Sequence, residues 1–198
     1  MTVSGPSHPA MLDLDAPENI ARWRPLVQWI LAIPHLIVAS ILGYVVFVIW
    51  VISFFTVLFT RRVPEGLHNF QVMVQRYSWR AYSYAGFMHD KYPPFDFSMR
   101  ADDPGDQPPT VSLAHEQQLN RWLPLVKWLL IIPHLIVITV LALVAYIVWI
   151  IAFFAVIILG RYPTGLRDFL VGFFRWTWRI YSYIYYLNDT YPPFSLSR

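Results

Sequence analysis

The chain has 198 residues, of which 57% are hydrophobic, 18% aromatic and 14% charged, with a formal net charge of +3 and no cysteine. This composition is too apolar for an ordinary soluble domain, and the small positive charge lacks the basic clusters of nucleic-acid-binding proteins. The lack of cysteine excludes disulfides and thiolate metal sites. We therefore expect a membrane protein with no nucleic-acid partner.

Residues 1–14 form a short segment of mixed composition with two prolines, so we expect a disordered tail. Asp15-Ala16-Pro17-Glu18 has the features of a helix start, with an Asp cap, an early proline and a Glu three residues after the Asp. The first twenty residues contain no basic segment, and the apolar stretch that follows is too long to belong to a cleavable signal. We expect it to act as an uncleaved anchor.

Two long apolar runs, residues 26–60 and 128–160, carry no charged residue. A helix needs roughly 20 apolar residues to cross the hydrocarbon core of a bilayer, so each run exceeds one span. As one straight helix, the first run would measure about 52 Å, against ~30 Å of hydrocarbon. Each run therefore either crosses once, with its first part along the interface, or folds into a hairpin of two short helices.

A hairpin would turn near residues 40–43 in the first run and 139–142 in the second. The second of these segments has no Gly, Asn or Pro, which favours a single crossing. Hairpins, however, place all fifteen Lys and Arg residues on one side of the membrane, whereas single crossings divide them seven against eight. We predict hairpins, with Pro34 and Pro133 as kinks, and a single long kinked span as the alternative.

A second helix is predicted after each run, over residues 66–89 and 165–188. Arginines near its middle cost about 2.5–3.5 kcal/mol each in a span, and they recur on one face of an otherwise aromatic helix. This pattern is typical of a helix that lies in the headgroup layer. The alternative is pairing within the protein, for example with Asp168 or Asp189. We predict contact of the following arginines with anionic lipid headgroups: Arg76, Arg80, Arg175 and Arg179 on the helices, and Arg62 and Arg161 at the preceding corners.

The second half of the chain repeats the first half 99 residues later, and 13 of the 17 residues between positions 22 and 38 are identical to their partners. Residues 96–112, rich in Asp and Pro, predict an exposed acidic linker. We therefore expect an all-α integral membrane protein with two tandem repeats, residues 15–95 and 113–198. Each repeat is expected to be a Pro-kinked transmembrane hairpin followed by an amphipathic interfacial helix.

The repeats share a set of motifs, which the second copy shows most completely. They are Ile132-Pro133-His134, Gly160-Arg161-Tyr162-Pro163, Arg175-Trp176-Thr177-Trp178-Arg179 and a closing Asp189-Thr190-Tyr191-Pro192-Pro193-Phe194. The first copy departs at the corner, Thr60-Arg61-Arg62-Val63, and has Tyr77 in place of the first Trp. Over nearly its whole length the chain resembles the DUF4389 family of small bacterial and archaeal membrane proteins. The resemblance implies a membrane module and no particular activity.

His35 and His134 occupy equivalent positions in the two apolar runs, each after a proline. Ionisable residues at membrane depth are candidates for function, and two neutral imidazoles could ligate a haem iron or serve a proton or quinone site. We favour the simpler interpretation that each bonds a backbone carbonyl freed by the proline, so no cofactor or metal is expected. The Tyr-Pro-Pro-Phe segments could bind a partner, but more simply they end a helix and fold aromatic rings back onto it.

No nucleophile, phosphate loop or carboxylate pair has a recognisable catalytic frame, so we do not expect an enzyme. We expect a non-catalytic scaffold or accessory subunit of a larger complex, bound to phospholipids and other membrane subunits. Its place would be the bacterial plasma membrane, multi-pass, with termini and linker cytoplasmic. One alternative is a cofactor- or lipid-binding membrane protein. A small channel or transporter is disfavoured by the uncharged runs.

Overall fold

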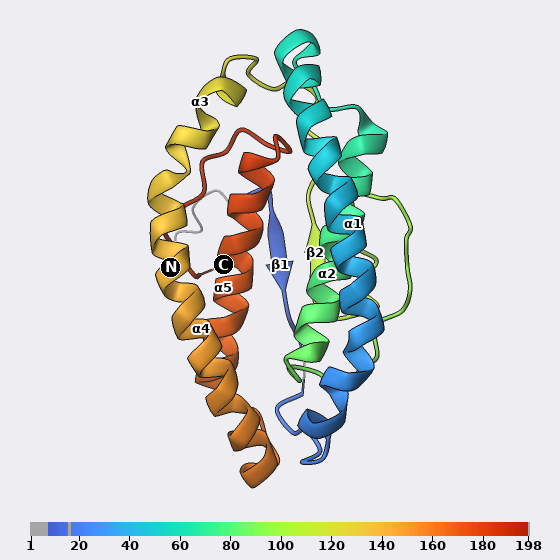
Figure 1. Cartoon of the computed structure of the whole chain (residues 1–198), viewed down its shortest axis with the longest axis vertical. Coiled ribbons are helices and arrows are strands. Elements are labelled where there is room, and N and C mark those ends of the chain that lie inside the picture. The colour runs from blue at the N-terminus through green and yellow to red at the C-terminus, as the bar shows by residue number, and fades with distance from the viewer. Residues whose placement is uncertain (1–7, 16, 198) are drawn as a thin grey trace, which may run out of the picture.

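The computed structural model describes residues 8–15 and 17–197, and within them two strands and five helices follow one another (Figure 1). The elements, in chain order, are β1 (Met11–Asp13), α1 (Arg24–Thr60), α2 (Glu65–Ala85), β2 (Thr110–Ser112), α3 (Leu123–Leu130), α4 (Ile132–Leu159) and α5 (Thr164–Ile184). The all-α expectation is confirmed apart from the two three-residue strands. The second helix of each repeat lies within a few residues of its predicted bounds.

The first apolar run forms one uninterrupted helix, so the predicted hairpin is wrong. The 37 residues of α1 correspond to about 55 Å of helix. At the predicted turn the Ser40 hydroxyl donates to the Leu36 carbonyl at 2.8 Å, and Thr139 does the same to Leu135 at 2.7 Å in the second repeat. These bonds belong to a continuing helix. The runs contain too little turn-forming sequence to break their backbone ladders, so helix propagation prevails.

The two prolines predicted as kinks differ in their effect. Pro34 lies inside α1, whereas Pro133 lies in the first turn of α4, just after a break at Ile131 that separates α3 from α4. The predicted helix start at Asp15–Glu18 is also wrong, because α1 begins at Arg24 with Pro25 in its first turn. A proline is well tolerated there, because the backbone N–H that it lacks would have no partner within the helix in the first turn.

Each repeat is an antiparallel pair of helices, and the two pairs run in opposite directions (Figure 1). Two backbone hydrogen bonds show how they are related. The Ile20 amide donates to the Gly160 carbonyl at 3.1 Å, and the Leu119 amide donates to the Arg61 carbonyl at 2.7 Å. Each residue of the first bond lies 99 positions from a residue of the second. The same contact is thus made twice, as an approximate two-fold axis between inverted repeats requires.

The strands lie on this approximate axis. β1 and β2 pair antiparallel, and Leu12 faces Val111, its own equivalent 99 residues later. The strands correct two predictions. Residues 8–14 do not belong to a disordered tail, and residues 110–112 of the predicted linker are a strand; residues 1–7 lie outside the described residues. Local composition did not reveal the strands because each is stabilised by the other repeat.

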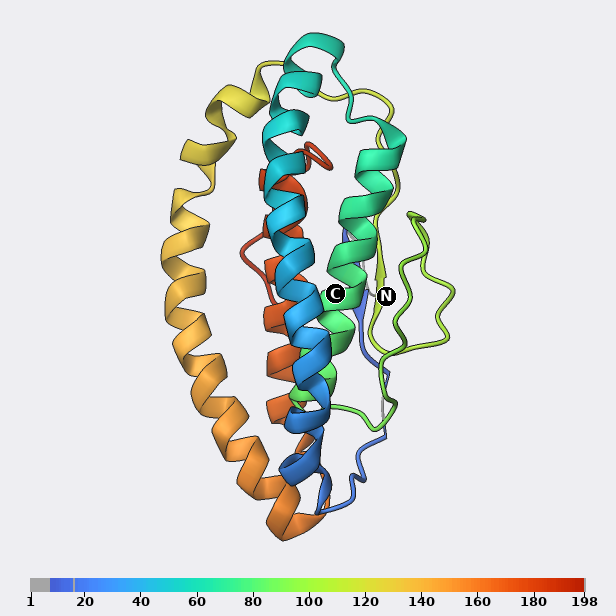
Figure 2. The ribbon, with the colours of Figure 1, turned by 45° about the vertical axis from the view of Figure 1, so that its right-hand side comes forward.

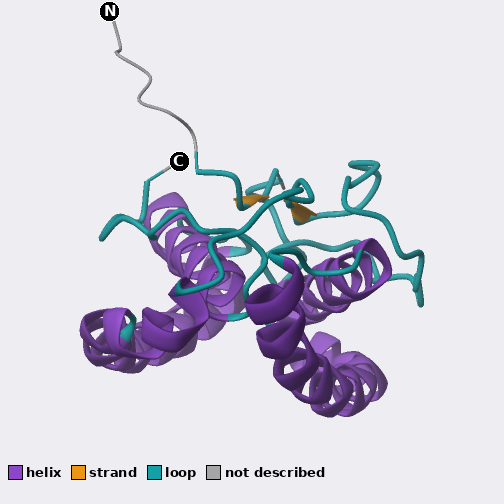
Figure 3. Ribbon diagram, turned by 90° about the horizontal axis from the view of Figure 1, so that it is seen from above, coloured by secondary structure: helices purple, strands orange, loops and turns teal. Residues whose placement is uncertain are grey.

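The molecule is layered, as the view along its long axis shows (Figure 3). The long apolar helices α1 and α4 form one outer layer, α2 and α5 the middle layer, and the loops, strands and termini cover the opposite side (Figures 2 and 3). Buried side chains of the middle layer and the loops, such as Val72, Trp178 and Leu113, belong to one hydrophobic core cluster that also includes residues of α4. Only 22% of the most apolar stretch of α1, and 17% of that of α4, is buried.

Candidate functional site

Arg76 lies near the middle of α2, where the linker covers it, and is only 2% exposed. Its guanidinium donates to the carbonyl of Asp102 at 2.6 Å, and to the carbonyls of Ser98 at 3.0 Å and Arg100 at 3.3 Å. Burial is the main influence lowering the pKa of Arg76. The arginine therefore holds the backbone of the linker against the helix.

Arg80, one turn further along α2, is surrounded by the acidic residues of the same linker. Its guanidinium lies 3.0 Å from a carboxylate oxygen of Asp103, 3.6 Å from Asp106 and 3.8 Å from Asp96. The second carboxylate oxygen of Asp103 accepts the Val111 amide at 2.9 Å. The acidic segment therefore folds over α2 and neutralises its arginine instead of forming a free tether.

On α5 the equivalent arginines face the N-terminal strand. Arg175 donates to the carbonyls of Leu12 at 2.9 Å and Leu196 at 3.0 Å, and its guanidinium lies 3.3 Å from a carboxylate oxygen of Asp13. Arg179 is only 5% exposed. Among residues 8–15 and 17–197, its guanidinium forms no hydrogen bond or ion pair, and its buried Nε has no partner. The two repeats therefore differ in how they surround the equivalent arginines Arg80 and Arg179.

These contacts correct the prediction that Arg76, Arg80, Arg175 and Arg179 meet lipid headgroups. All four are buried beneath the chain's own loops, because segments far away in the sequence supply oxygen atoms over the polar face. Pairing within the protein was the stated alternative, but the partner of Arg175 is Asp13 and not Asp168 or Asp189. Arg62 and Arg161 remain exposed at the two corners, so lipid contact stays a prediction for them.

His35 is fully buried in an aromatic box that the Tyr-Pro-Pro-Phe segment closes. Its ring stacks on Phe95 at 4.1 Å between centroids, Tyr92 meets it edge-on, and its Nδ1 lies 2.8 Å from the Tyr77 hydroxyl. The predicted bond to a freed carbonyl is therefore replaced by one to a tyrosine. The segment folds its aromatic rings back onto the helix, as expected.

His134 occupies the equivalent box in the second repeat. Phe194 stacks on it at 3.8 Å and 8°, and Tyr191 and Trp176 approach it edge-on. Trp176 stands where Tyr77 stands in the first repeat, so the hydroxyl partner is missing. Neither ring nitrogen of His134 has a hydrogen-bond partner in the described part of the chain.

The two histidines do not form one site. Each lies near the start of its long apolar helical run, and α1 and α4 start at opposite ends of the molecule (Figure 1). Joint axial ligation of one haem iron is therefore wrong, because the inverted arrangement of the repeats separates the two imidazoles. No group of three or more potential metal ligands occurs among the described residues.

Gln28 and Lys127 are equivalent buried residues that motif reading missed. Gln28 donates to the His89 carbonyl at 2.7 Å, and Lys127 donates to the Asn188 carbonyl at 2.6 Å. Lys127 also pairs with Asp189 at 2.9 Å, and burial lowers its pKa. The sequence did contain a signal for them. Each is a polar residue between Val and Trp, and these two apolar neighbours are identical in both repeats.

Two separate hollows lie beside these helices. One, of about 450 Å³, is lined almost entirely by apolar and aromatic side chains, including Leu36, Ala145 and Phe174. The other, of about 250 Å³, lies between α5 and the strands and contains Arg175 and Arg179. The second hollow is the more polar of the two and contains Arg179, the buried arginine that has no acceptor among the described residues.

Exposed apolar helices, inverted repeats and buried arginines define a duplicated module of membrane-protein composition, in which each copy is an antiparallel pair of a long and a shorter helix. The family model described as "Domain of unknown function (DUF4389)" matches residues 22–96 and again residues 122–195. The chain belongs to this family, with one copy of the domain in each repeat. No curated protein and no solved structure matches it.

Proposed function

We propose that this protein is a non-catalytic scaffold or accessory subunit embedded in the bacterial plasma membrane. The observation that carries the proposal is the apolar layer formed by α1 and α4, which carry exposed apolar side chains along the whole length of both helices. Exposed apolar patches of this extent mark a membrane or protein interaction surface. Their uncharged composition over more than 30 consecutive residues favours lipid.

We further propose that α1 and α4 lie along the membrane in one leaflet instead of crossing it. The acidic linker packs beside the middle of α2, where Asp106, 65% exposed on its side chain, reaches Arg80. If α1 crossed the bilayer at its centre, this linker would lie at the depth of the hydrocarbon. Exposed backbone and carboxylates are not tolerated there.

Charge supports the same orientation. With α1 and α4 in the plane, all fifteen Lys and Arg residues lie on the side of the loops, as the positive-inside rule favours for the cytoplasm. This proposal replaces the predicted multi-pass topology by two helices that lie in one leaflet. It keeps the predicted cytoplasmic location of the termini and the linker. Arg62 and Arg161 flank the ends of the apolar layer, where they can reach anionic phosphates.

The orientation can be tested by labelling single cysteines, because the chain has none of its own. Ala21→Cys and Gly66→Cys mark the two ends of α1, and Gly105→Cys marks the linker. We expect a membrane-impermeant maleimide to label all three in inverted vesicles and none in spheroplasts. Labelling of the two α1 ends from opposite sides would establish a crossing and disprove the in-plane arrangement.

The scaffold role has its own test. The tagged protein is purified from its native membrane in a mild detergent, and the co-purifying proteins are quantified. We expect at least one integral membrane protein in stoichiometric amount. Recovery of the protein with phospholipid alone, under conditions that preserve other complexes of the same membrane, would contradict the proposed role.

A further inference from the structure

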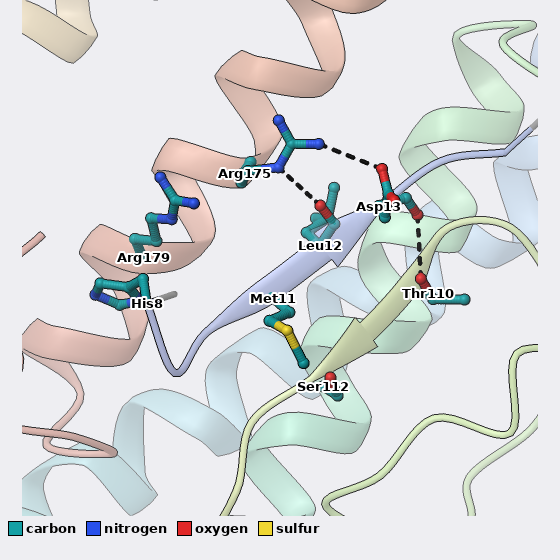
Figure 4. Close-up of a pocket in the computed structure, with 8 residues that line it drawn as sticks. All are labelled: His8, Met11, Leu12, Asp13, Thr110, Ser112, Arg175 and Arg179. Atoms are coloured by element: carbon teal, nitrogen blue, oxygen red, sulfur yellow. Dashed lines mark hydrogen bonds and ion pairs between the residues drawn. The ribbon is translucent and has the colours of Figure 1, made fainter. Parts of the chain in front are cut away.

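We propose that the pocket between α5, β1 and β2 binds a phosphate-bearing anion through Arg179, with Arg175 beside it. The pocket has a volume of about 250 Å³, and the two arginines and His8 line one side of it (Figure 4). Leu12 and Asp13 of β1, and Thr110 and Ser112 of β2, line the other. None of these residues belongs to the apolar layer of α1 and α4.

The comparison between the repeats is the first argument. Arg80 has three carboxylates of the linker within 4 Å, whereas Arg179, at the same position 99 residues later, has none among the described residues. Both arginines are almost completely buried. One copy of the module thus carries its counter-ions within the chain, and the other leaves an open place for one.

Charge and burial supply the second argument. A guanidinium does not lose its proton at ordinary pH, so a buried arginine without a partner is an uncompensated charge. Burial lowers the pKa of Arg179, and the neighbouring Arg175 lowers it further. Arg175 is itself satisfied by two carbonyls and Asp13. Among the described residues that line the pocket, no carboxylate lies within ion-pair distance of Arg179.

The lining residues determine the kind of anion that fits. A guanidinium presents parallel N–H groups that match phosphate oxygens in a bidentate geometry. The Nδ1 of His8 accepts the Ala10 amide at 3.1 Å, so the proton of the neutral ring lies on Nε2, an atom that is buried inside the protein. Burial lowers the pKa of His8 to about 4, which keeps that ring neutral. The Arg179 guanidinium beside a neutral His8 therefore suits a phosphate group, either of a small soluble molecule or of a lipid headgroup.

The experiment uses the full chain in nanodiscs of zwitterionic lipid and inorganic phosphate as the probe, with chloride at equal ionic strength as the reference. We expect phosphate to raise Tm in the wild type and its affinity to fall at least tenfold in Arg179→Met. Arg100→Gln, which removes an exposed arginine outside the pocket, should bind phosphate as the wild type does. Nanodiscs of anionic lipid without phosphate identify a headgroup as the source if they alone raise Tm and if Arg179→Met abolishes that rise.

A second pair of variants tests whether Arg179 lacks a counter-ion or is already paired within the protein. In phosphate-free buffer, Arg80→Met should lower Tm because it leaves three carboxylates without their cation, whereas Arg179→Met should raise it. An equal loss of Tm in both would mean that Arg179 already has a partner, and the proposal would be overturned. It would also be overturned if neither phosphate nor anionic lipid raised Tm in the wild type, or if Arg179→Met responded as the wild type does.

Discussion

At the scale of single residues, the two repeats make an equivalent hydrogen bond with side chains of different chemistry. Gln28 of α1 and Lys127 of α3 are equivalent residues, and both bond the backbone just after the second helix of their own repeat. Gln28 does so as a neutral amide, whereas Lys127 also carries a charge that needs Asp189 and the Tyr183 ring, 4.4 Å from its amine. Burial of a charge is tolerated here because each donor has an acceptor.

Substitutions at Lys127 test this account. Lys127→Gln copies the first repeat and retains a donor, so we expect only a small loss of stability. Lys127→Met removes the donor and leaves the Asn188 carbonyl and Asp189 without it, which should cost about 1–3 kcal/mol. Thermal unfolding in detergent measures both variants. An equal loss in the two would show that the charge, and not the hydrogen bond, is what stabilises the turn.

At the scale of elements, the repeats lock together through side chains that project from each long helix onto the turn of the other repeat. Trp50 stacks on Tyr186 with centroids 6.2 Å apart, and Trp149 stacks on Phe87 at 5.8 Å. Phe87 and Tyr186 both have positive φ, 48° and 63°. The side chains that fill the interface thus come from backbone positions that bulky residues rarely occupy.

The two tryptophans form a matched pair for mutation. Trp50 also donates to the Ile184 carbonyl at 2.9 Å, whereas no such bond is made by Trp149 in the described chain. Trp50→Phe should therefore cost about 1 kcal/mol more than Trp149→Phe, the net value of one hydrogen bond. Unfolding in the same detergent compares them. Indistinguishable losses would argue that stacking alone holds this interface.

The linker offers a second test of how elements are held. Asp103→Ala removes the closest counter-ion of Arg80 and the acceptor of the Val111 amide, so we expect a loss of about 3–5 kcal/mol. Asp102→Ala is the control, because Asp102 contributes only its carbonyl to Arg76. Protease sensitivity of residues 96–112 should rise in Asp103→Ala and stay unchanged in Asp102→Ala. Equal sensitivity would mean that the linker is held by its backbone bonds alone.

At the scale of the whole molecule, inversion of the repeats lets each complete the other. β1 pairs with β2, and each end of one long helical run is bonded to a segment of the other repeat. Duplication of a crossing hairpin would preserve its orientation in the membrane. The inverted arrangement is compatible with a tandem duplication if neither copy crosses, as in the proposed in-plane arrangement.

Buried histidines predict how the molecule responds to acid. Burial lowers the pKa of His8, His68 and His89 to about 4, from about 6.5. The unfolded chain then binds more protons between these values, so stability is complete above about pH 6.5 and falls as the pH drops toward 4. Each histidine removes at most about 1.4 kcal/mol per pH unit.

Unfolding at pH 7.5, 6 and 5 in one detergent measures this slope. His89→Gln should be less sensitive to acid than the wild type, because one of the three groups is removed. His115→Gln serves as the control, since His115 is only partly buried. Stability that is constant across this range would contradict the assignment of neutral buried rings.

Much of the local structure was predictable from the sequence. Uncharged apolar runs predict long helices because nothing in them offers the backbone a better set of hydrogen bonds, and the aromatic, arginine-bearing segments form helices close to the expected bounds. The 99-residue repeat predicted two copies of one module, and the family match confirms them. The exposure of α1 and α4 likewise follows from their composition.

The partners of the polar residues were decided only by the tertiary structure. The amphipathic pattern around Arg76 and Arg80 describes a polar face equally well whether lipid phosphates or the chain's own oxygen atoms cover it. The choice depends on residues 96–112 and 8–13 folding back over α2 and α5, and therefore on contacts between distant segments. For the same reason the strands, the inversion of the repeats and the lack of a described counter-ion at Arg179 could not be read from local sequence patterns.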